Sequence, residues 1–592
     1  MKQANLEVLE KRFPHVAEKT KNYNENIVEP IIYELFDKDE IWLQAVKEIV
    51  EDSKIIFVYG FGQGLSIADL LEEFPDRWLF IYEPDEASFN KLVCEYDISP
   101  LLNHPNLYWI SLGNNQIKTL FYLLCSYMQE KLAFIGLRKY LEDEIETLHK
   151  IKEEFLSYKD DYTSNKYVEN RFRNEWTQNY LYHLHESLTT HSIEKMYGTF
   201  KGNTAIIVSS GPSLTEDIDW IRKVSKHALI IAAGSSVQAL VKHGIQPHLC
   251  VIMDGHEVNN KIFSSDKTLQ PTLLFTSSSF YEISERKGEN KIYSIMENDQ
   301  ISQYFLQKSK NDILMMPTPT VAGTAIQAAI FLGAEQIVFA GQDLSYPGQK
   351  LYSDGVEHLS QDLKIEMLKR AVKQVENVQG GMNFTDASFM SMKESIESLI
   401  KYFDHVEFYN SSRLGAVIEG APFKPIEEIH ENLNKAKILQ HNLFETWIND
   451  HPITVDHEKY MALKEKVEFV LKDVFLIKSE IREIQKLIGT IEGLSRIKPL
   501  KCHNMIFDIE EKWGRIVNRE WFTPIFESLI PLQLAHFDRM LPAIVVEQNI
   551  IIKAGYIREH LGGILTEVET QLPYLESLLV ESGKRIDSIQ GV

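Results

Sequence analysis

Serine, threonine and glycine gather where an apolar segment passes into a helix. SSGPSL, residues 209–214, follows the apolar AIIV and precedes TEDIDWI, which puts Glu216 and Asp217 in the expected first helical turn. Ser213 or Thr215 suits the N-cap position. A helix N-terminus offers unpaired N–H groups and about half a positive charge, so this turn suits a phosphate. The alternative, a capped surface helix, would not need two serines and a glycine directly before it.

A second cluster of the same kind occurs about a hundred residues later. PTPTVAGTAIQAAIFLG places Thr318, Thr320, Gly323 and Thr324 at the start of a helix, and the strand-like QIVFAGQD follows at once. Ligands of open α/β sheets bind at the carboxyl ends of parallel strands. We therefore expect the two hydroxyl-rich helix starts to face one cleft.

Two aspartates also end predicted strands. Asp343 closes QIVFAGQD, and Asp254 follows the apolar residues of VIMDGH. A carboxylate at such a place can bind a ligand hydroxyl or a metal ion. It can equally cap a loop, and for Asp254 the sequence leaves both interpretations open.

The N-terminal region carries a separate glycine turn. In VYGFGQGLSIADLL, Gly60, Gly62 and Gly64 lie between a strand and a helix, and Glu83 ends the next strand. Nucleotide- and S-adenosylmethionine-binding folds use such glycines for close backbone approach and the acidic residue for ribose. Any tight strand-to-helix turn also favours glycine, so a purely structural turn is the alternative.

Around these turns the pattern predicts an α/β protein with two Rossmann-like parallel-sheet domains and an α-helical C-terminal domain. Short apolar segments alternate with helices, as in buried parallel strands, until residue 425, where long helices of period 3.6 take over. The predicted domains are 1–165 (N-terminal helices and a Rossmann-like domain), 166–200 (helical connector), 201–425 (central catalytic domain) and 426–592 (helical bundle).

Composition excludes several classes of protein. The 592 residues carry a formal net charge of −23, which argues against nucleic acid as a partner. No apolar stretch is long enough to span a membrane and no signal-peptide core is present at the N-terminus. The four cysteines have no paired spacing, so we expect a cytoplasmic protein without a cysteine metal cluster.

Four motifs together resemble the motility-associated factor (Maf) proteins of flagellated bacteria: AIIVSSGPSL, IQPHLCVIMDGH, TVAGTAIQAAIFLGAEQIVFAGQDLSY and FYNSSRLGAVIEGA. They cover about residues 200–422. The region is also similar to 6-hydroxymethylpterin pyrophosphokinases and to bacterial sialyltransferases that use cytidine monophosphate (CMP) sugars. The resemblance implies transfer of a nonulosonic acid, such as pseudaminic or legionaminic acid, from its CMP form to serine or threonine of flagellin, as flagellum assembly and motility require.

The resemblance also implies roles for individual residues. His358 corresponds to the catalytic base, and Tyr346 and Tyr352 to tyrosines that hold the departing phosphate. The residues implied to line the nucleotide-sugar site are Ser209, Ser210, Gly211, Pro212, Ser213, Gly234, Ser235, Asp254, Thr320, Gly323, Thr324, Gln342 and Asp343. Related enzymes need no metal, so no cofactor is expected, and the helical C-terminus is the expected flagellin-docking domain.

Two other functions stay open. A pterin-type pyrophosphokinase would need ATP and Mg²⁺, with Asp254 and Asp343 as metal-binding carboxylates. The long extra domains argue against it, since a small-molecule kinase needs no protein-docking bundle. A flagellin-binding chaperone without enzymatic activity would use the α/β domains as scaffolding, which the hydroxyls and glycines at strand ends disfavour.

Overall fold

The computed structural model describes residues 3–21, 39–127, 131–309, 312–433, 435 and 438–589. The chain forms two compact units, Met1–Asn170 with Leu532–Val546, and Arg171–Pro531 with Glu547–Val592. This division is coarser than the predicted one, so the boundaries near 165, 200 and 425 stay predictions. The part of the predicted N-terminal helices at 22–38 lies outside the described residues.

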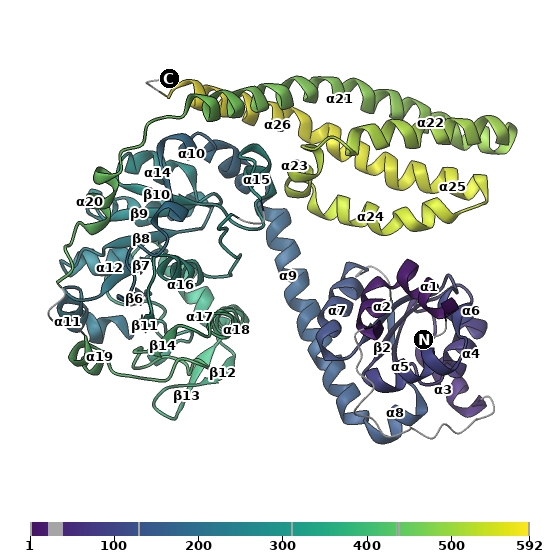
Figure 1. The fold of residues 1–592 in the computed structure, drawn as a ribbon, viewed down its shortest axis with the longest axis horizontal. Helices are drawn as coiled ribbons and strands as arrows, with labels where there is room; N and C mark the ends of the chain where they lie inside the picture. The colour runs from purple at the N-terminus through teal and green to yellow at the C-terminus, as the bar shows by residue number, and fades with distance from the viewer. Residues whose placement is uncertain are drawn as a thin grey trace. The chain divides into compact units, whose positions relative to one another are not determined.

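The first unit is built on a parallel sheet of order β3-β2-β1-β4 (Figure 1). Its strands are β1 Ile55–Tyr59, β2 Trp78–Glu83, β3 Leu107–Leu112 and β4 Leu132–Gly136. Its helices are α1 Gln3–Arg12, α2 Pro14–Lys21, α3 Glu40–Val50, α4 Leu65–Glu73, α5 Glu86–Glu95, α6 Ser99–Leu102, α7 Ile117–Ser126, α8 Arg138–Asp143, the first part of α9 Ile145–His183, and α24 Pro531–Val546.

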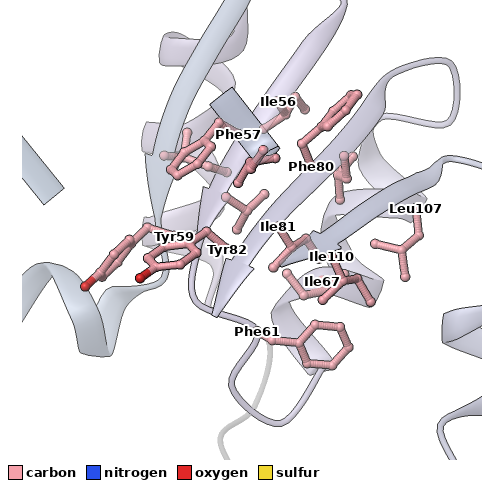
Figure 2. Close-up of a cluster of buried hydrophobic side chains, with 14 of the residues drawn as sticks. Ile56, Phe57, Tyr59, Phe61, Ile67, Phe80, Ile81, Tyr82, Leu107 and Ile110 are labelled. Carbon is pink, nitrogen blue, oxygen red and sulfur yellow. The ribbon is translucent and has the colours of Figure 1, made fainter. Parts of the chain in front are cut away.

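Apolar side chains on both faces of this sheet form its core. Every residue of β1 is buried, as a central parallel strand requires. Figure 2 shows Phe57 and Phe80 of neighbouring strands on one side of the sheet, and Ile81 and Ile110 near Ile67 of α4 on the other. Helix α7 ends at Ser126, and the apolar LAFIG of residues 132–136 forms the fourth strand, which the sequence analysis did not predict.

The second unit contains an eight-stranded parallel sheet of order β14-β11-β6-β7-β8-β9-β10-β5. Its strands are β5 His191–Ser192, β6 Thr204–Val208, β7 Leu229–Ala233, β8 Leu249–Ile252, β9 Thr272–Thr276, β10 Lys291–Ser294, β11 Gln336–Ala340 and β14 Glu407–Asn410. All but β5 fall within predicted apolar segments. The predicted fold class, two parallel α/β sheets followed by helices, is confirmed.

Alternate residues of these strands point to two different apolar layers. On one face, Ile207 and Ile231 pack with helices that include α16 Val321–Phe331 and α18 Ala387–Tyr402. On the other, Ile206 and Ile230 pack with α11 Leu214–Val224, α12 Ser236–Lys242, α14 Tyr281–Lys287 and α19 Ile426–Asn432. The sheet is therefore covered on both sides, and its strand ends are left as the place for a site.

Smaller elements complete the α/β region. They are α10 Glu186–Thr189, α13 Asp266–Leu269, α15 Gln300–Phe305, α17 Gln361–Lys369 and an antiparallel hairpin of β12 Lys373–Glu376 and β13 Met382–Thr385. The sequence analysis did not predict this hairpin, because almost none of its residues is buried and no apolar alternation marks it.

The C-terminal helices belong to the same compact unit as this sheet. They are α20 Leu443–Asp450, α21 His457–Ile497, α22 Pro499–Val517, α23 Phe522–Leu529, α25 Ile550–Tyr556 and α26 Gly562–Asp587. Long α21 buries one apolar residue per turn, as its period predicts.

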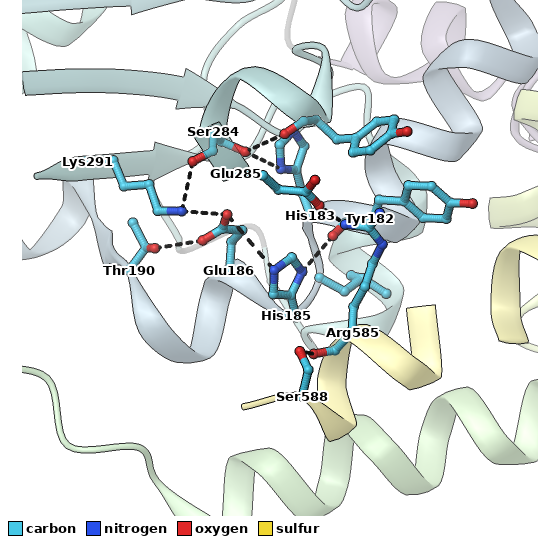
Figure 3. A network of polar contacts seen from close by, with 12 residues as sticks. Tyr182, His183, His185, Glu186, Thr190, Ser284, Glu285, Lys291, Arg585 and Ser588 are labelled. Carbon is cyan, nitrogen blue, oxygen red and sulfur yellow. Dashed lines mark hydrogen bonds and ion pairs between the residues drawn. The ribbon is translucent and has the colours of Figure 1, made fainter. Parts of the chain in front are cut away.

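A polar network attaches the end of α26 to the α/β region (Figure 3). Arg585 pairs with Glu285 and lies over the rings of Tyr182 and Tyr281, at 4.2 and 5.0 Å from the ring centroids. Behind it, Lys291 and Glu186 form a buried ion pair of 2.6 Å. A charged pair at this depth fixes geometry, because removing either partner would leave an uncompensated buried charge.

Candidate functional site

The candidate site lies where the order of the larger sheet reverses. From β6 the chain adds β7 to β10 on one side and β11 and β14 on the other. Ligands of open α/β sheets bind outside the carboxyl ends of the strands at such a switch point. SSGPSL leaves β6 and GQDLSY leaves β11 at this position, so the sheet brings the two predicted segments together.

A buried carboxylate fixes the SSGPSL turn. Asp343 accepts hydrogen bonds from the backbone N–H of Ser213, at 2.8 Å, and from the Ser213 hydroxyl. The Ser213 hydroxyl in turn accepts one from the N–H of Leu414, at 2.9 Å. Burial raises the pKa of Asp343 to about 6, although the Ser213 hydrogen bonds oppose the rise. These two predicted site residues thus hold the turn together.

Three of the turn's amides form hydrogen bonds within the chain. The N–H of Gly211 donates to Gly341 O at 2.9 Å, that of Ser213 to Asp343, and that of Leu214 to Gly211 O. Pro212 has no N–H. Because these three amides hydrogen-bond within the chain, they are not free to bind a phosphate, and the predicted phosphate cradle stays a prediction for the rest of the turn. Ser213 does occupy the N-cap position of α11, but its hydroxyl makes no capping hydrogen bond.

Gly211 shows how closely this turn is packed. A Cβ added there would lie 2.4 Å from a carboxylate oxygen of Asp343 and 2.6 Å from Gly341 O. Only glycine lets the backbone of the turn come this close to the segment that follows β11. Next to it, the hydroxyl of Ser209 donates to Gln342 Oε1 at 2.5 Å.

Two further hydroxyls lie where the chain leaves β6 and β7, those of Ser210 and Ser235. Their Oγ atoms lie 3.0 Å apart, and both side chains are half-buried. Ser235 follows Gly234 at the end of β7, and a Cβ on Gly234 would lie 3.7 Å from Val321 at the start of α16. The ends of β6 and β7 therefore meet the start of α16 at a pair of hydroxyls.

The start of α16 is held by its own threonines. The Thr320 side chain accepts from Ala322 N and so caps the helix. Gly323 packs against Thr318, whose Oγ1 would lie 2.7 Å from an added Cβ. Thr324 is buried and donates to the sulfur of Met253 at 3.2 Å. These residues position α16 beside the end of β8, where Asp254 follows.

Asp254, Tyr352 and His358 gather near these strand ends. The Asp254 side chain reaches solvent yet is enclosed by protein atoms, and the partial loss of hydration raises the pKa of its carboxyl. Burial, together with the Asp254 charge, raises the pKa of Tyr352 to about 12, so its hydroxyl stays protonated. The rings of Tyr352 and His358 lie 5.4 Å apart. Desolvation lowers the pKa of His358 to about 4, and its buried Nδ1 has no hydrogen-bond partner among the described residues.

Tyr346 has different surroundings. Its hydroxyl donates to Asp386 at 2.5 Å, where Asp386 caps α18, and its ring packs on Phe389 at 4.9 Å. The structure therefore uses this hydroxyl to hold α18 through Asp386, while Tyr346 also interacts electrostatically with Tyr352, so its predicted role at the phosphate stays a prediction.

Sequence reasoning missed Ser353. Its N–H donates to Ser210 O at 2.8 Å, it is 5% exposed, and its Oγ has no hydrogen-bond partner in the described part of the chain. Nothing in the surrounding SDGVEH signals this contact. By contrast, the missed β12–β13 hairpin carries a Gly380–Gly381 pair, a usual sign of a hairpin turn.

The N-terminal glycine turn is filled by the chain itself. Buried Glu83 accepts hydrogen bonds from the N–H groups of Phe61 at 2.7 Å and Gly62 at 3.2 Å, and from the Tyr140 hydroxyl at 2.6 Å. Gly60, with φ of +101°, would bring an added Cβ within 2.3 Å of the Tyr140 ring. Glu83 thus binds the backbone of the turn itself, which favours the interpretation that these glycines form a structural turn and not a ligand site.

The described residues offer neither a metal-ligand cluster nor a membrane-spanning helix. No three His, Cys, Asp or Glu side chains lie together as metal ligands among the residues that the structure describes. None of the described helices combines the length and the apolar composition that crossing a membrane requires.

Comparison with known proteins first gives a class for the region that holds this site. Residues 178–349 match a family described as 6-hydroxymethylpterin diphosphokinase MptE-like. No curated protein matches the chain.

The whole fold then has a solved counterpart, the MAf glycosyltransferase from Magnetospirillum magneticum AMB-1. That structure is similar to this chain with a TM-score of 0.56 and 13% sequence identity, over 100% of this chain and 97% of that one. The predicted resemblance to the Maf proteins is thereby confirmed at the level of the fold, and that to the pterin kinases by the family match in the central region. The resemblance to CMP-sugar sialyltransferases stays a prediction.

Proposed function

We propose that this protein is a glycosyltransferase whose donor site lies at the carboxyl ends of β6, β7 and β8. The observation that carries the proposal is its full-length similarity in fold to a Maf glycosyltransferase. The cluster of Ser210, Ser235, Asp254, Tyr352 and His358 at the switch point adds the polar groups that a nucleotide sugar needs.

The donor is a CMP-activated nonulosonic acid of the pseudaminic or legionaminic type. In this proposal the paired hydroxyls of Ser210 and Ser235 bind the phosphate, in place of the turn amides that the chain already uses. Asp254 accepts a hydrogen bond from a ribose hydroxyl, since no described residue donates one to its carboxylate.

The acceptor is a serine or threonine hydroxyl of flagellin, and the reaction supports flagellum assembly and motility. The bond between the anomeric carbon and the phosphate oxygen breaks through an oxocarbenium-like state, and CMP leaves with the electron pair. The acceptor oxygen bonds to the anomeric carbon and its proton passes to His358, which is neutral at pH 7. Tyr352, protonated, donates to the leaving phosphate.

A pterin pyrophosphokinase is the second candidate, because the matched family carries that description. Its predicted metal carboxylates were Asp254 and Asp343. Both oxygens of Asp343 are occupied by Ser213, which leaves Asp254 alone to hold Mg²⁺ beside the phosphates of ATP. This geometry favours the transferase. The chaperone alternative assigns no role to the clustered hydroxyls.

Thermal unfolding of the purified protein with CMP, UDP, ATP or S-adenosylmethionine, each with and without Mg²⁺, separates these candidates. Ligands that bind only the folded state raise the unfolding temperature. The proposal expects a rise with CMP that Ser235→Ala reduces. A rise with ATP and Mg²⁺ alone would favour the kinase, and no rise with any nucleotide would favour the chaperone.

A further inference from the structure

A cavity of about 430 Å³ opens beside the SSGPSL turn, between the start of α11, the segment after β11 and the β12–β13 hairpin. Its volume lies in the range of about 300–1,000 Å³ that is usual for ligand sites. The residues that define it most clearly are Pro212, Thr215, Lys350, Tyr352, Asp354 and Gln379.

Hydrogen bonds hold the hairpin wall of this cavity in place. Asn383 donates to Ser345 Oγ at 2.9 Å and to Leu414 O at 2.6 Å, and Tyr346 N donates to Phe384 O at 2.8 Å. These bonds tie the hairpin, which buries little of itself, to the segment that follows β11. The wall is therefore pre-formed.

The opposite wall is shared with the proposed donor site. Tyr352 and Asp354 line the cavity, whereas Ser353 between them bonds to Ser210 through its N–H. Asp354 N also donates to Thr215 Oγ1 at 3.2 Å. Tyr352 also interacts electrostatically with Asp254 of the proposed donor site. The same tyrosine therefore contacts both the donor site and the cavity.

The lining is polar and slightly acidic. Glu216 and Asp354 outnumber Lys350, and Gln379 adds a carboxamide, as do Asn377 and Asn383. A donor with both a phosphate and a sugar carboxylate would be repelled by this balance of charge. The Gln379 carboxamide can both donate and accept, so it matches the N–H and C=O groups of an extended peptide. The carboxamides of Asn377 and Asn383 already hydrogen-bond within the chain and shape the wall.

We propose that this cavity is the acceptor subsite, and that it binds an extended, uncharged or basic polypeptide segment carrying the reacting hydroxyl. The inference rests on the proposed glycosyltransferase function. It assigns the hairpin, which the sequence analysis missed, to acceptor selection. It places the acceptor beside Tyr352, whose ring lies 5.4 Å from that of His358, the proposed base.

Two matched substitutions on the hairpin test this. Gln379→Trp fills the cavity, whereas Gln374→Trp makes the same change at an exposed position of β12 outside the lining. Each full-length variant is tested for binding to purified flagellin of the source organism, by biolayer interferometry, and for the thermal shift caused by CMP. We expect Gln379→Trp to weaken flagellin binding at least about fivefold, roughly 1 kcal/mol or more, with the CMP shift unchanged, and Gln374→Trp to change neither.

Equal flagellin binding by both variants would overturn the proposal, as would a lost CMP shift in Gln379→Trp, which would make the cavity part of the donor site. Absence of measurable flagellin binding by the unmodified protein would overturn it too. If CMP does not shift the unmodified protein but Gln379→Trp still loses flagellin, the proposed donor fails while the acceptor cavity stands.

Discussion

Asp343 should make the stability of the second unit depend on pH in a way that one substitution removes. The side chain is 2% exposed, and burial raises its pKa from an ordinary value near 3.8 to about 6. Between about pH 4 and about pH 6 the folded protein keeps a proton that the unfolded chain has lost. Its contribution to stability is therefore complete below about pH 4 and is lost as the pH rises through about 6.

The size of the effect follows from that difference. Raising the pKa from near 3.8 to about 6 corresponds to about 3 kcal/mol of unfolding free energy. Asp343→Asn has no such titration. Its amide can still accept from Ser213 N and donate to Ser213 Oγ, so the turn keeps its hydrogen bonds.

Urea unfolding of both proteins from about pH 4 to about pH 7, followed by circular dichroism, measures the difference. We expect the wild type to lose about 3 kcal/mol relative to Asp343→Asn over this range. Asp217 and Asp299, whose pKa values burial also raises to about 6, cancel in the comparison. Asp343→Ala identifies the unfolding transition of the part that contains this turn, because that transition shifts most in this variant. Each Ser213 donor left without a partner costs about 1–3 kcal/mol. Parallel pH curves for wild type and Asp343→Asn would refute the reasoning.

Further substitutions test other parts of the structure. Gly60→Ala, at φ of +101°, should destabilise the first unit by about 1–3 kcal/mol or more in thermal unfolding, and an unchanged unfolding temperature would contradict the filled turn. Ser235→Ala should weaken CMP binding about tenfold by calorimetry without loss of stability, whereas unchanged affinity would exclude its proposed contact. Lys291→Met should cost about 3–5 kcal/mol by leaving Glu186 buried without its cation, and adding Glu186→Gln should recover part of that loss; a double variant less stable than the single one would contradict this.

The sequence predicted the strands of both sheets other than β4 and β5, because a central parallel strand must be apolar on both faces. β6 and β7 are short apolar segments with glycine or serine directly after them, and both features follow from their place in the sheet. The switch point could also be expected, since SSGPSL and GQDLSY each end such a strand. β4 was missed because its five residues follow an apolar helix with no marked change in composition.

The partners of the site residues could not be predicted in the same way. Whether an N–H of the SSGPSL turn meets a ligand or a protein acceptor depends on how closely β11 approaches. Gly211 permits an approach in which its own N–H and that of Ser213 bond to residues after β11. Likewise, a strand-end aspartate can face a ligand or a serine. Asp343 faces Ser213, whereas Asp254 remains open to solvent, and only the packing around each distinguishes them.

The most direct test of the proposed function is the intact mass of flagellin after incubation with this protein and a CMP-activated nonulosonic acid. The account predicts that flagellin gains the mass of one or more sugar residues as CMP is released, and that His358→Ala abolishes the gain. If the wild-type protein binds both flagellin and CMP but flagellin keeps its original mass, the proposal is contradicted. An equal gain of mass with His358→Ala would contradict the role of His358.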